Sequence, residues 1–289
     1  MPEHQSLDEN SEFLQKLVKG VNASGYPSEI RTAIRFQKAG WIVLDHMYFV
    51  DKDENIGREI DLYAASNYFA ESDQKRIRLN ISLAVEVKKS TKRPWAILTT
   101  PKTNLDIDRK GEIFLTSLAR MHHQEIWFHE LYANHPAFDL DCLGRVAFYG
   151  SIAQNPGKET EAEGNKSAET AFKALISAGK ASVELSATHQ TSHNEALREG
   201  IPIKKTYVVG ITHGLLVVDA QLFLGRLDEN DNLILEPTKY VPYVMNYASE
   251  KYGYKRILVD IVHIDHLPKY IENYGEWGKN RAQFCLEQL

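Results

Sequence analysis

Two charged residues interrupt an otherwise apolar stretch of the sequence, ISLAVEVKK at residues 81–89. Its β-branched and aliphatic residues predict a buried β-strand, yet Glu86 and Lys88 stand two positions apart within it. Side chains alternate across a strand, so the carboxylate and the ammonium project from the same face. Placed side by side, such groups can bind a cation, position a water molecule or stabilise developing negative charge.

A second acid, Asp61, lies in the preceding predicted strand, REIDLYAAS at residues 58–66. Alternation places Asp61 on the face opposite to Ile60 and Leu62. If the two strands are neighbours, Asp61 can approach Glu86 and Lys88. The simpler alternative is that Glu86 and Lys88 form an exposed pair on the solvated face of a half-buried strand, with Asp61 a separate surface acid.

The clustered arrangement predicts a metal site. Crowded carboxylates raise each other's pKa, and a divalent cation removes that repulsion. Mg²⁺ prefers hard oxygen ligands and often takes one or two carboxylates together with water and phosphate. We therefore predict that Asp61 and Glu86 bind Mg²⁺, for which Mn²⁺ can substitute. Lys88 would orient or deprotonate the attacking water, or stabilise charge on the phosphate.

The elements that would position these residues run in the order helix, strand, strand, strand. SEIRTAIRFQKAG predicts a helix with Ser28 as N-cap and Gly40 at its end, with Ile30 and Ile34 on one face. Strands are predicted at residues 41–50, 58–66 and 81–89, and the polar insert at 64–80 forms a long hairpin tip.

Further along, IFLTSLARMHHQEIWFHELYA at residues 113–133 has a helical pattern, and the loop at 155–167 precedes a helix predicted over 166–187. Two strands are predicted on either side of a turn at His213 and Gly214. More strands are predicted around residues 232–237 and 256–264, and a C-terminal helix opens near Pro268. The chain is a mixed α/β protein with a central sheet.

The ordered set of acids and lysine resembles the PD-(D/E)xK nuclease superfamily, which has the restriction-endonuclease-like fold. In that family an acid on one strand precedes (D/E)-x-K on the next, as do Asp61 in REIDLYA and Glu86-Val87-Lys88 in VEVKKS. Glu29, in YPSEIRTAIRFQKAGW, occupies the place of a further family acid on the preceding helix. Ile60 replaces the proline of the family name, and the interval from Asp61 to Glu86 is longer than in many members. The runs REIDLYA and VEVKKSTKRPW look like an uncharacterised bacterial branch.

The resemblance implies an αβββαβ core with a mixed central sheet flanked by helices. A single nuclease domain would span residues 1–289, with core segments at 26–95 and about 166–212, a helical insertion at about 101–165, and a β-rich C-terminal extension at about 213–289. It also implies Mg²⁺-dependent hydrolysis of phosphodiester bonds, in DNA rather than RNA, in a restriction, defence or repair setting. The catalytic residues would be Asp61, Glu86, Lys88 and Glu29. The protein would act as a homodimer or as a subunit of a larger complex.

The charge distribution bears on nucleic-acid binding. The net charge is −5, but residues 75–110 contain ten basic and three acidic residues, a local charge of +7 that leaves −12 on the remainder. The predicted phosphate contacts flank the motif and are Lys89, Ser90, Lys92 and Arg93. Lys173 and Lys180, on the predicted 166–187 helix, are expected to be solvated. Trp95 would pack against the sheet or stack on a base.

Two other functional classes are consistent with the sequence. The same fold can be a catalytically inactive subunit that binds nucleic acid or a protein partner. The histidines at positions 122, 123, 129 and 135 could instead form the zinc site of an unrelated enzyme, but their spacing matches no H-E-x-x-H signature.

Composition places the chain among ordinary globular proteins. It has 289 residues, of which 43% are hydrophobic and 25% charged. Two cysteines are too few for a disulfide framework. The start is polar and acidic rather than signal-like, and no apolar run is long enough to span a membrane. We therefore expect a cytoplasmic protein.

Overall fold

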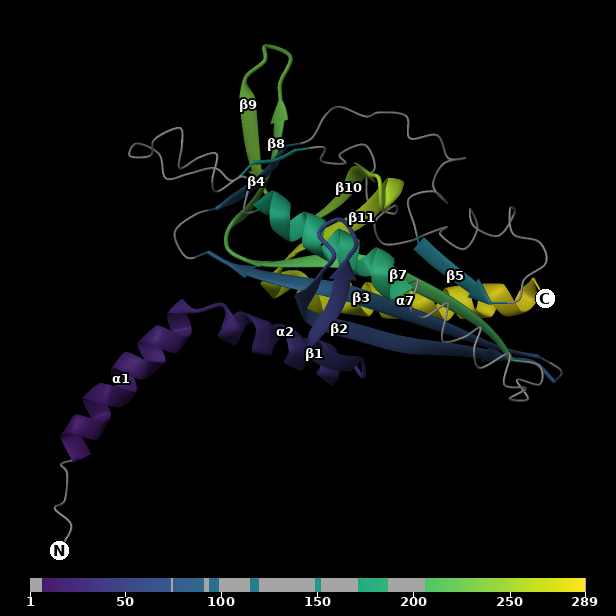
Figure 1. Ribbon diagram of the computed structural model, residues 1–289, viewed down its shortest axis with the longest axis horizontal. Coiled ribbons are helices and arrows are strands. Elements are labelled where there is room, and N and C mark those ends of the chain that lie inside the picture. The colour runs from purple at the N-terminus through teal and green to yellow at the C-terminus, as the bar shows by residue number, and fades with distance from the viewer. Residues whose placement is uncertain are drawn as a thin grey trace, which may run out of the picture.

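The computed structural model describes residues 7–73, 75–90, 94–98, 115–119, 149–151, 171–186 and 206–288. These residues form a mixed α/β fold around a seven-stranded sheet (Figure 1). The strand order is β1-β2-β3-β7-β11-β10, and β5 pairs with β7 beside this series. The strands are β1 Ile42–Asp51, β2 Ile56–Glu71, β3 Arg76–Lys89, β5 Leu115–Ala119, β7 Thr206–Asp219, β10 Tyr240–Ser249 and β11 Gly253–His263.

The sheet is mixed in direction. β1, β2 and β3 form an antiparallel meander, β3 and β11 run parallel to β7, and β10 returns antiparallel to β11. A smaller sheet has the order β6-β4-β8-β9. Its strands are β4 Trp95–Leu98, β6 Tyr149–Ser151, β8 Leu222–Leu227 and β9 Leu233–Pro237.

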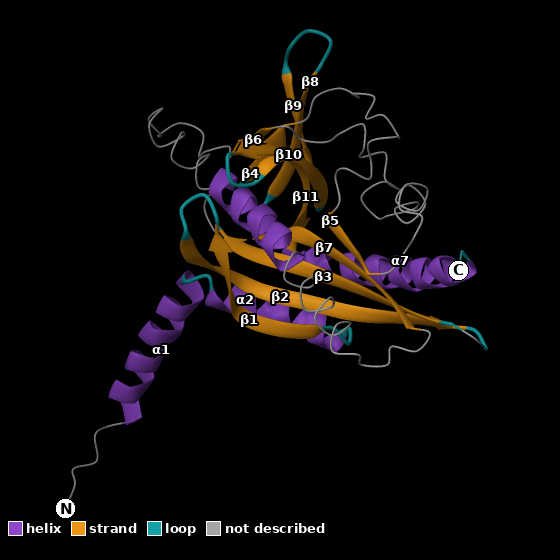
Figure 2. Ribbon diagram, turned by 45° about the vertical axis from the view of Figure 1, so that its right-hand side comes forward, coloured by secondary structure: helices purple, strands orange, loops and turns teal. Residues whose placement is uncertain are grey.

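Helices cover both faces of the central sheet (Figure 2). On one face lie α2 Tyr26–Lys38 and α7 Leu267–Glu287, which follows the short 3₁₀ turn η3 Ile264–His266. The opposite face carries the helix over residues 171–186, teal in Figure 1. The first helix, α1 Leu7–Ala23, extends away from this body. No helix in the described part of the chain combines the length and apolar character needed to cross a membrane.

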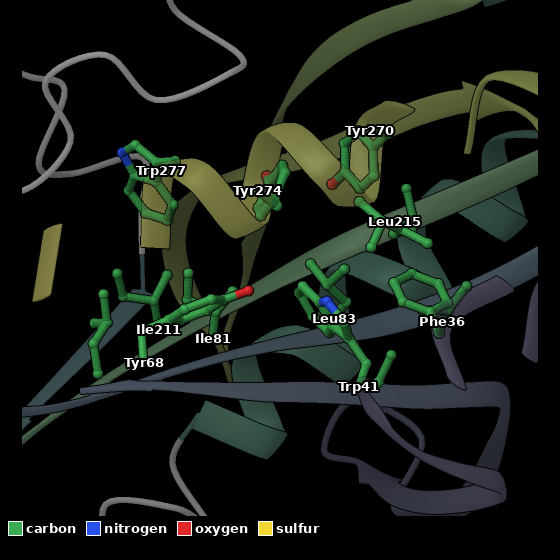
Figure 3. Close-up of a cluster of buried hydrophobic side chains, with 14 of the residues drawn as sticks. Phe36, Trp41, Tyr68, Ile81, Leu83, Ile211, Leu215, Tyr270, Tyr274 and Trp277 are labelled. Carbon is green, nitrogen blue, oxygen red and sulfur yellow. The ribbon is translucent and has the colours of Figure 1, made fainter. Parts of the chain in front are cut away.

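Alternation along β3 divides the core into its two sides. Ile81, Leu83 and Val85 point toward α2 and α7, where Phe36 and Tyr274 complete the largest hydrophobic cluster (Figure 3). Between them, Ala84 faces the helix over 171–186 and packs with Ala181. This strand begins five residues earlier than predicted and β2 ends five residues later, so the insert forms the expected hairpin.

The predicted turn at His213 and Gly214 is wrong, because β7 continues through both residues. Gly214 serves a close approach rather than a turn. A Cβ atom there would lie 3.1 Å from the carbonyl oxygen of Ala178, on the helix that crosses the strand. His213 is buried and its Nδ1 lies 3.2 Å from the hydroxyl oxygen of Tyr274.

Other local predictions are also corrected. Residues 115–119 form a strand rather than a helix, because they pair antiparallel with β7. Ser28 is not the N-cap, since α2 begins at Tyr26 with Gly25 before it. The remaining residues of the predicted 113–133 helix, with its histidines, lie outside the described residues. β10 was not predicted.

A buried acid joins β11 to α7. Asp260 is fully buried and accepts hydrogen bonds from the hydroxyl groups of Tyr240, Tyr270 and Tyr274 at 2.6–2.8 Å. Burial raises the pKa of Asp260, and the three hydroxyl donors partly oppose that increase. The predicted strand and C-terminal helix are therefore connected by polar contacts as well as by packing.

Lys180 is buried in an ionic cluster, which contradicts the prediction of a solvated lysine. Its Nζ lies 2.9 Å from Asp51 and 2.7 Å from Asp53, and Lys180 and Asp51 are only 5% and 2% exposed. Arg58 also contacts Asp51, at 3.0 Å. Hydrogen bonds from Lys180, Ser249 and Tyr247 lower the pKa of Asp53 to about 2. The cluster fixes the β1–β2 turn to the helix over 171–186.

Replacing Lys180 with Met should destabilise the protein by about 3 kcal/mol at pH 7, because Asp51 stays buried with Arg58 as its remaining cation. The pKa of Asp53 in the folded protein lies below its value in the unfolded chain. The stabilisation of the folded protein by the Lys180–Asp53 ion pair is therefore present above about pH 4 and is lost as the pH falls toward 2. The difference between wild type and variant should therefore narrow below about pH 4.

Urea unfolding at several pH values measures this difference. Lys269→Met, which removes the exposed pair with Glu272, is the matched control and should leave stability unchanged. Equal stability of the Lys180→Met variant and wild type at pH 7 would contradict a buried ionic cluster.

Candidate functional site

Asp61 and Glu86 meet because β2 and β3 are neighbouring strands. Their antiparallel pairing ends with Leu62 opposite Val85, and Asp61 and Glu86 are the next residues along the two strands. Residues opposite each other in such a pair project from the same face of the sheet. The structure meets the condition that these two strands are neighbours, on which the predicted approach of Asp61 to Glu86 and Lys88 depends.

One ammonium group joins the two acids. Lys88 Nζ lies 2.6 Å from Glu86 Oε2 and 3.5 Å from Asp61 Oδ2. Those two carboxylate oxygens are therefore no more than 6.1 Å apart, the sum of the two distances. The backbone N–H of Val87 also donates to Asp61 Oδ2, at 2.7 Å, which fixes the orientation of this carboxylate against β3.

The strand alternation breaks beside Asp61. Ile60 packs with Tyr63 on one side of the sheet, whereas Leu62 belongs to the core cluster on the other. The prediction that Ile60 and Leu62 share one face is therefore wrong. The β1 residue expected opposite Asp61 is His46, but the β1–β2 pairing skips it. The φ of His46 is 51°, which lies in the left-handed region. This local irregularity accompanies the turn of Asp61 toward β3.

Glu86 is the most deeply buried member of the site, with 5% of its surface exposed. Burial raises the pKa of Glu86, and the adjacent Lys88 opposes this effect while Asp61 adds to it. Both of its oxygens have donors: Lys88 at Oε2, and the Ser177 hydroxyl at Oε1 at 2.6 Å. The alternative of an exposed Glu86–Lys88 pair on a solvated face is thus wrong for Glu86.

Lys88 carries its positive charge in this arrangement. Burial lowers the pKa of Lys88, but attraction to Glu86 and Asp61 outweighs burial and the net change is upward. A protonated ammonium donates hydrogen bonds and cannot accept a proton. In this state Lys88 can orient a water molecule or stabilise an anion, but cannot deprotonate the water.

Glu29 lies in the first turn of α2, close enough to the site to experience its charges. Burial raises the pKa of Glu29, Asp61 raises it further, and Lys88 lowers it. The Glu29 carboxylate folds back toward Gly25, where an added Cβ would lie 3.1 Å from Oε1. The neighbouring acid Glu59 is held elsewhere, since it accepts hydrogen bonds from His46 and Tyr48.

The donor set fits Mg²⁺ with water completing its shell. Two oxygens bound to one Mg²⁺ at 2.0–2.1 Å lie at most about 4.2 Å apart. The carboxylate oxygens lie within 6.1 Å of each other, and because the Lys88 ammonium contacts both, an ion bound by both acids would require these side chains to move. Within the described residues, no three His, Cys, Asp or Glu side chains form a cluster that could hold a metal ion on their own. Asp61 and Glu86 would therefore share the ion with other ligands.

The residues predicted to contact nucleic acid have other contacts where the structure describes them. Lys89 donates to the carbonyl of Asn22 at the end of α1, and the backbone N–H of Ser90 donates to the carbonyl of Asp219 at 3.1 Å. Lys92 and Arg93 lie outside the described residues. Trp95 is buried among apolar neighbours and packs in the core, so it does not offer a face to a base.

Sequence reasoning missed Ser177, and it missed a second polar group at the same end of β3. Arg31 lies 2.6 Å from Asp219, which also accepts a hydrogen bond from Ser28, and Asp219 pairs with Lys89 across β3 and β7. A lone serine on a helix and a lone aspartate after an apolar strand carry no signal in sequence. Helical periodicity places Ser177 one turn before Lys180 but does not indicate that it contacts Glu86.

No protein-family model, curated protein or solved structure matches the chain.

Replacing Lys88 with Met should lower the unfolding free energy by about 2 kcal/mol at pH 7, less than for a fully buried pair because Lys88 is a third exposed. Without the ammonium, the pKa of Glu86 should rise further above its unfolded value. A carboxyl group whose pKa is raised by folding destabilises the folded protein at high pH, where the group is ionised. This destabilisation disappears as the pH falls below the pKa of the group in the folded protein. The stability deficit should therefore shrink as the pH falls from 7 to 5.

Urea unfolding across this pH range tests the expectation. Lys89→Met is the control, because it removes the same charge at the next position, where the side chain donates a hydrogen bond to the Asn22 carbonyl and not to a carboxylate of the site. A deficit that stayed constant with pH would show that Lys88 does not influence the ionisation of Glu86.

Proposed function

We propose that the protein is a Mg²⁺-dependent nuclease of the restriction-endonuclease-like fold that hydrolyses phosphodiester bonds in DNA. The observation that carries the proposal is the shared ammonium: Lys88 contacts carboxylates from two adjacent strands, one of them almost fully buried. Two converging acids with an adjacent lysine constitute a site for a divalent cation and a phosphate.

The order of elements supports the same proposal. α2, β1, β2, β3, the helix over 171–186 and β7 follow each other as in an αβββαβ core. Ser177 and Glu86 connect the second helix of this series to the motif strand. The segment from about 101 to 165 is then an insertion between the strand that carries the motif and this helix.

Each residue has a role that follows from its contacts. Asp61 and Glu86 supply oxygen ligands, and Glu29 adds negative charge nearby. Bound Mg²⁺ would lower the pKa of a water molecule and polarise the phosphodiester. Lys88, protonated, donates hydrogen bonds that orient the water or stabilise charge on the phosphate. Ser177 holds Oε1 of Glu86, so that Oε2 keeps its direction toward Lys88.

The substrate is a polyanion that meets the basic segment around the motif. Lys89, Ser90, Lys92 and Arg93 stand directly after Lys88 in the chain, within the segment of net charge +7. DNA affinity should accordingly fall as salt rises, because phosphate contacts release counterions.

Purified protein incubated with plasmid DNA and Mg²⁺ or Mn²⁺ should cleave it. Asp61→Asn, Glu86→Gln and Lys88→Met should each reduce the cleavage rate by about 100-fold or more, since the two acids would hold the metal ion and Lys88 would orient the water or stabilise charge on the phosphate. Glu12→Gln makes the same acid-to-amide change on the exposed surface of α1 and should retain full activity.

Mg²⁺ binding by calorimetry provides a second readout that needs no turnover. Wild type should bind the ion, and Asp61→Asn should not. Binding of DNA without cleavage under both metals would favour the inactive subunit, and absence of both DNA and metal binding would refute the nuclease.

Ser177 offers a separate test of how Glu86 is held. Ser177→Ala should lower the cleavage rate by about 10-fold, because one carboxylate oxygen loses its donor in a nearly buried position. Ser177→Thr keeps the hydroxyl and should restore most of the activity. Equal rates for both variants, with unfolding curves like wild type, would show that the hydroxyl does not position Glu86.

A further inference from the structure

The surface of α1 is divided into an apolar and a charged side. The apolar stripe comprises Phe13, Leu14, Leu17, Val18 and Val21, whose side chains are 47–63% exposed. On the other side Lys16 pairs with Glu12 at 2.7 Å, and both are exposed. α1 extends away from the sheet and its end is attached near α2, so its stripe faces no other described element (Figure 1).

The next helix, α2, also exposes large apolar side chains. Tyr26, Ile30 and Ile34 follow each other at intervals of four residues and are 61%, 58% and 42% exposed. The buried side of this helix is formed instead by Ser28, Thr32 and Phe36. Two consecutive helices thus present large apolar side chains to the outside, which single domains rarely do over such an area.

We propose that a second copy of this chain covers the stripe, and that the protein is a dimer paired through α1 with support from α2. Leu14, Leu17 and Val21 are spaced three and four residues apart, which is the repeat that lets two like helices interlock their side chains. No charged side chain lies within the stripe, so two identical stripes can meet without repulsion.

The exposed area matches what such a dimer needs. Eight apolar residues, each about half exposed, offer about 700 Å² on each copy, close to the roughly 800 Å² per partner of a stable interface. A lipid surface is a poorer match, because amphipathic helices that bind anionic membranes carry a basic polar side. The sequence of α1 contains three acids, Asp8, Glu9 and Glu12, and two lysines, Lys16 and Lys19, so it is not basic.

One end of the interface would lie near the site formed by Asp61, Glu86 and Lys88. The carbonyl of Asn22, near the end of α1, accepts a hydrogen bond from Lys89, the residue after Lys88.

Sedimentation equilibrium of the full chain from about 1 to 100 µM tests the proposal. Wild type should show twice the 32.9 kDa mass of one chain. Leu17→Glu places a charge in the stripe and should raise the dissociation constant at least 100-fold, giving the mass of a single chain. Lys19→Glu introduces the same side chain on the charged side and should remain a dimer.

Far-ultraviolet circular dichroism establishes that both variants are folded. Three results would overturn the proposal: a single-chain mass for wild type across the range, an unchanged dimer for a folded Leu17→Glu variant, or binding of the single chain to phosphatidylserine vesicles through the stripe.

Discussion

A carboxylate that is removed from water on a core strand must receive compensating charge and hydrogen bonds, and this requirement organises the centre of the protein. Glu86 receives an ammonium at one oxygen and a hydroxyl at the other. Asp61 shares the same ammonium and takes a backbone N–H from β3. The group exists only when β2, β3 and the helix over 171–186 are correctly placed, because each supplies at least one member.

The helix over 171–186 is held closely against the sheet. Ala174, Ala178 and Ala181 let it lie close to the sheet, and Gly214 removes the side chain that would keep it away. Ser177 and Lys180 then connect it to the strands by polar contacts at two points along its length, one at Glu86 and one at Asp51. Close packing and two polar connections together determine where the Ser177 hydroxyl lies.

The parts of the site that sequence could predict are those that depend on alternation. Asp61, Glu86 and Lys88 were expected together because period-two reasoning and adjacent strands suffice to bring them to one face. Ser177, Gly214 and β5 depend on contacts between distant segments, which local patterns do not encode. Lys180 shows the same limit: a lysine on a helix resembles a surface residue, and its burial follows from the packing around it.

The parallel pairing of β3 with β7 joins segments separated by everything between residues 89 and 206. Closing so long a stretch of chain costs conformational entropy before the pairing compensates for it, and such contacts form late in folding. During synthesis β3 first exists as the outer strand of a three-stranded meander. The other edge of β3 stays unpaired with β7 until β7 is synthesised. Until then Gly214, against which the helix over 171–186 packs, is also absent. The site is therefore completed only after β7 has been synthesised, and not as soon as the strands and the helix that carry its side chains exist.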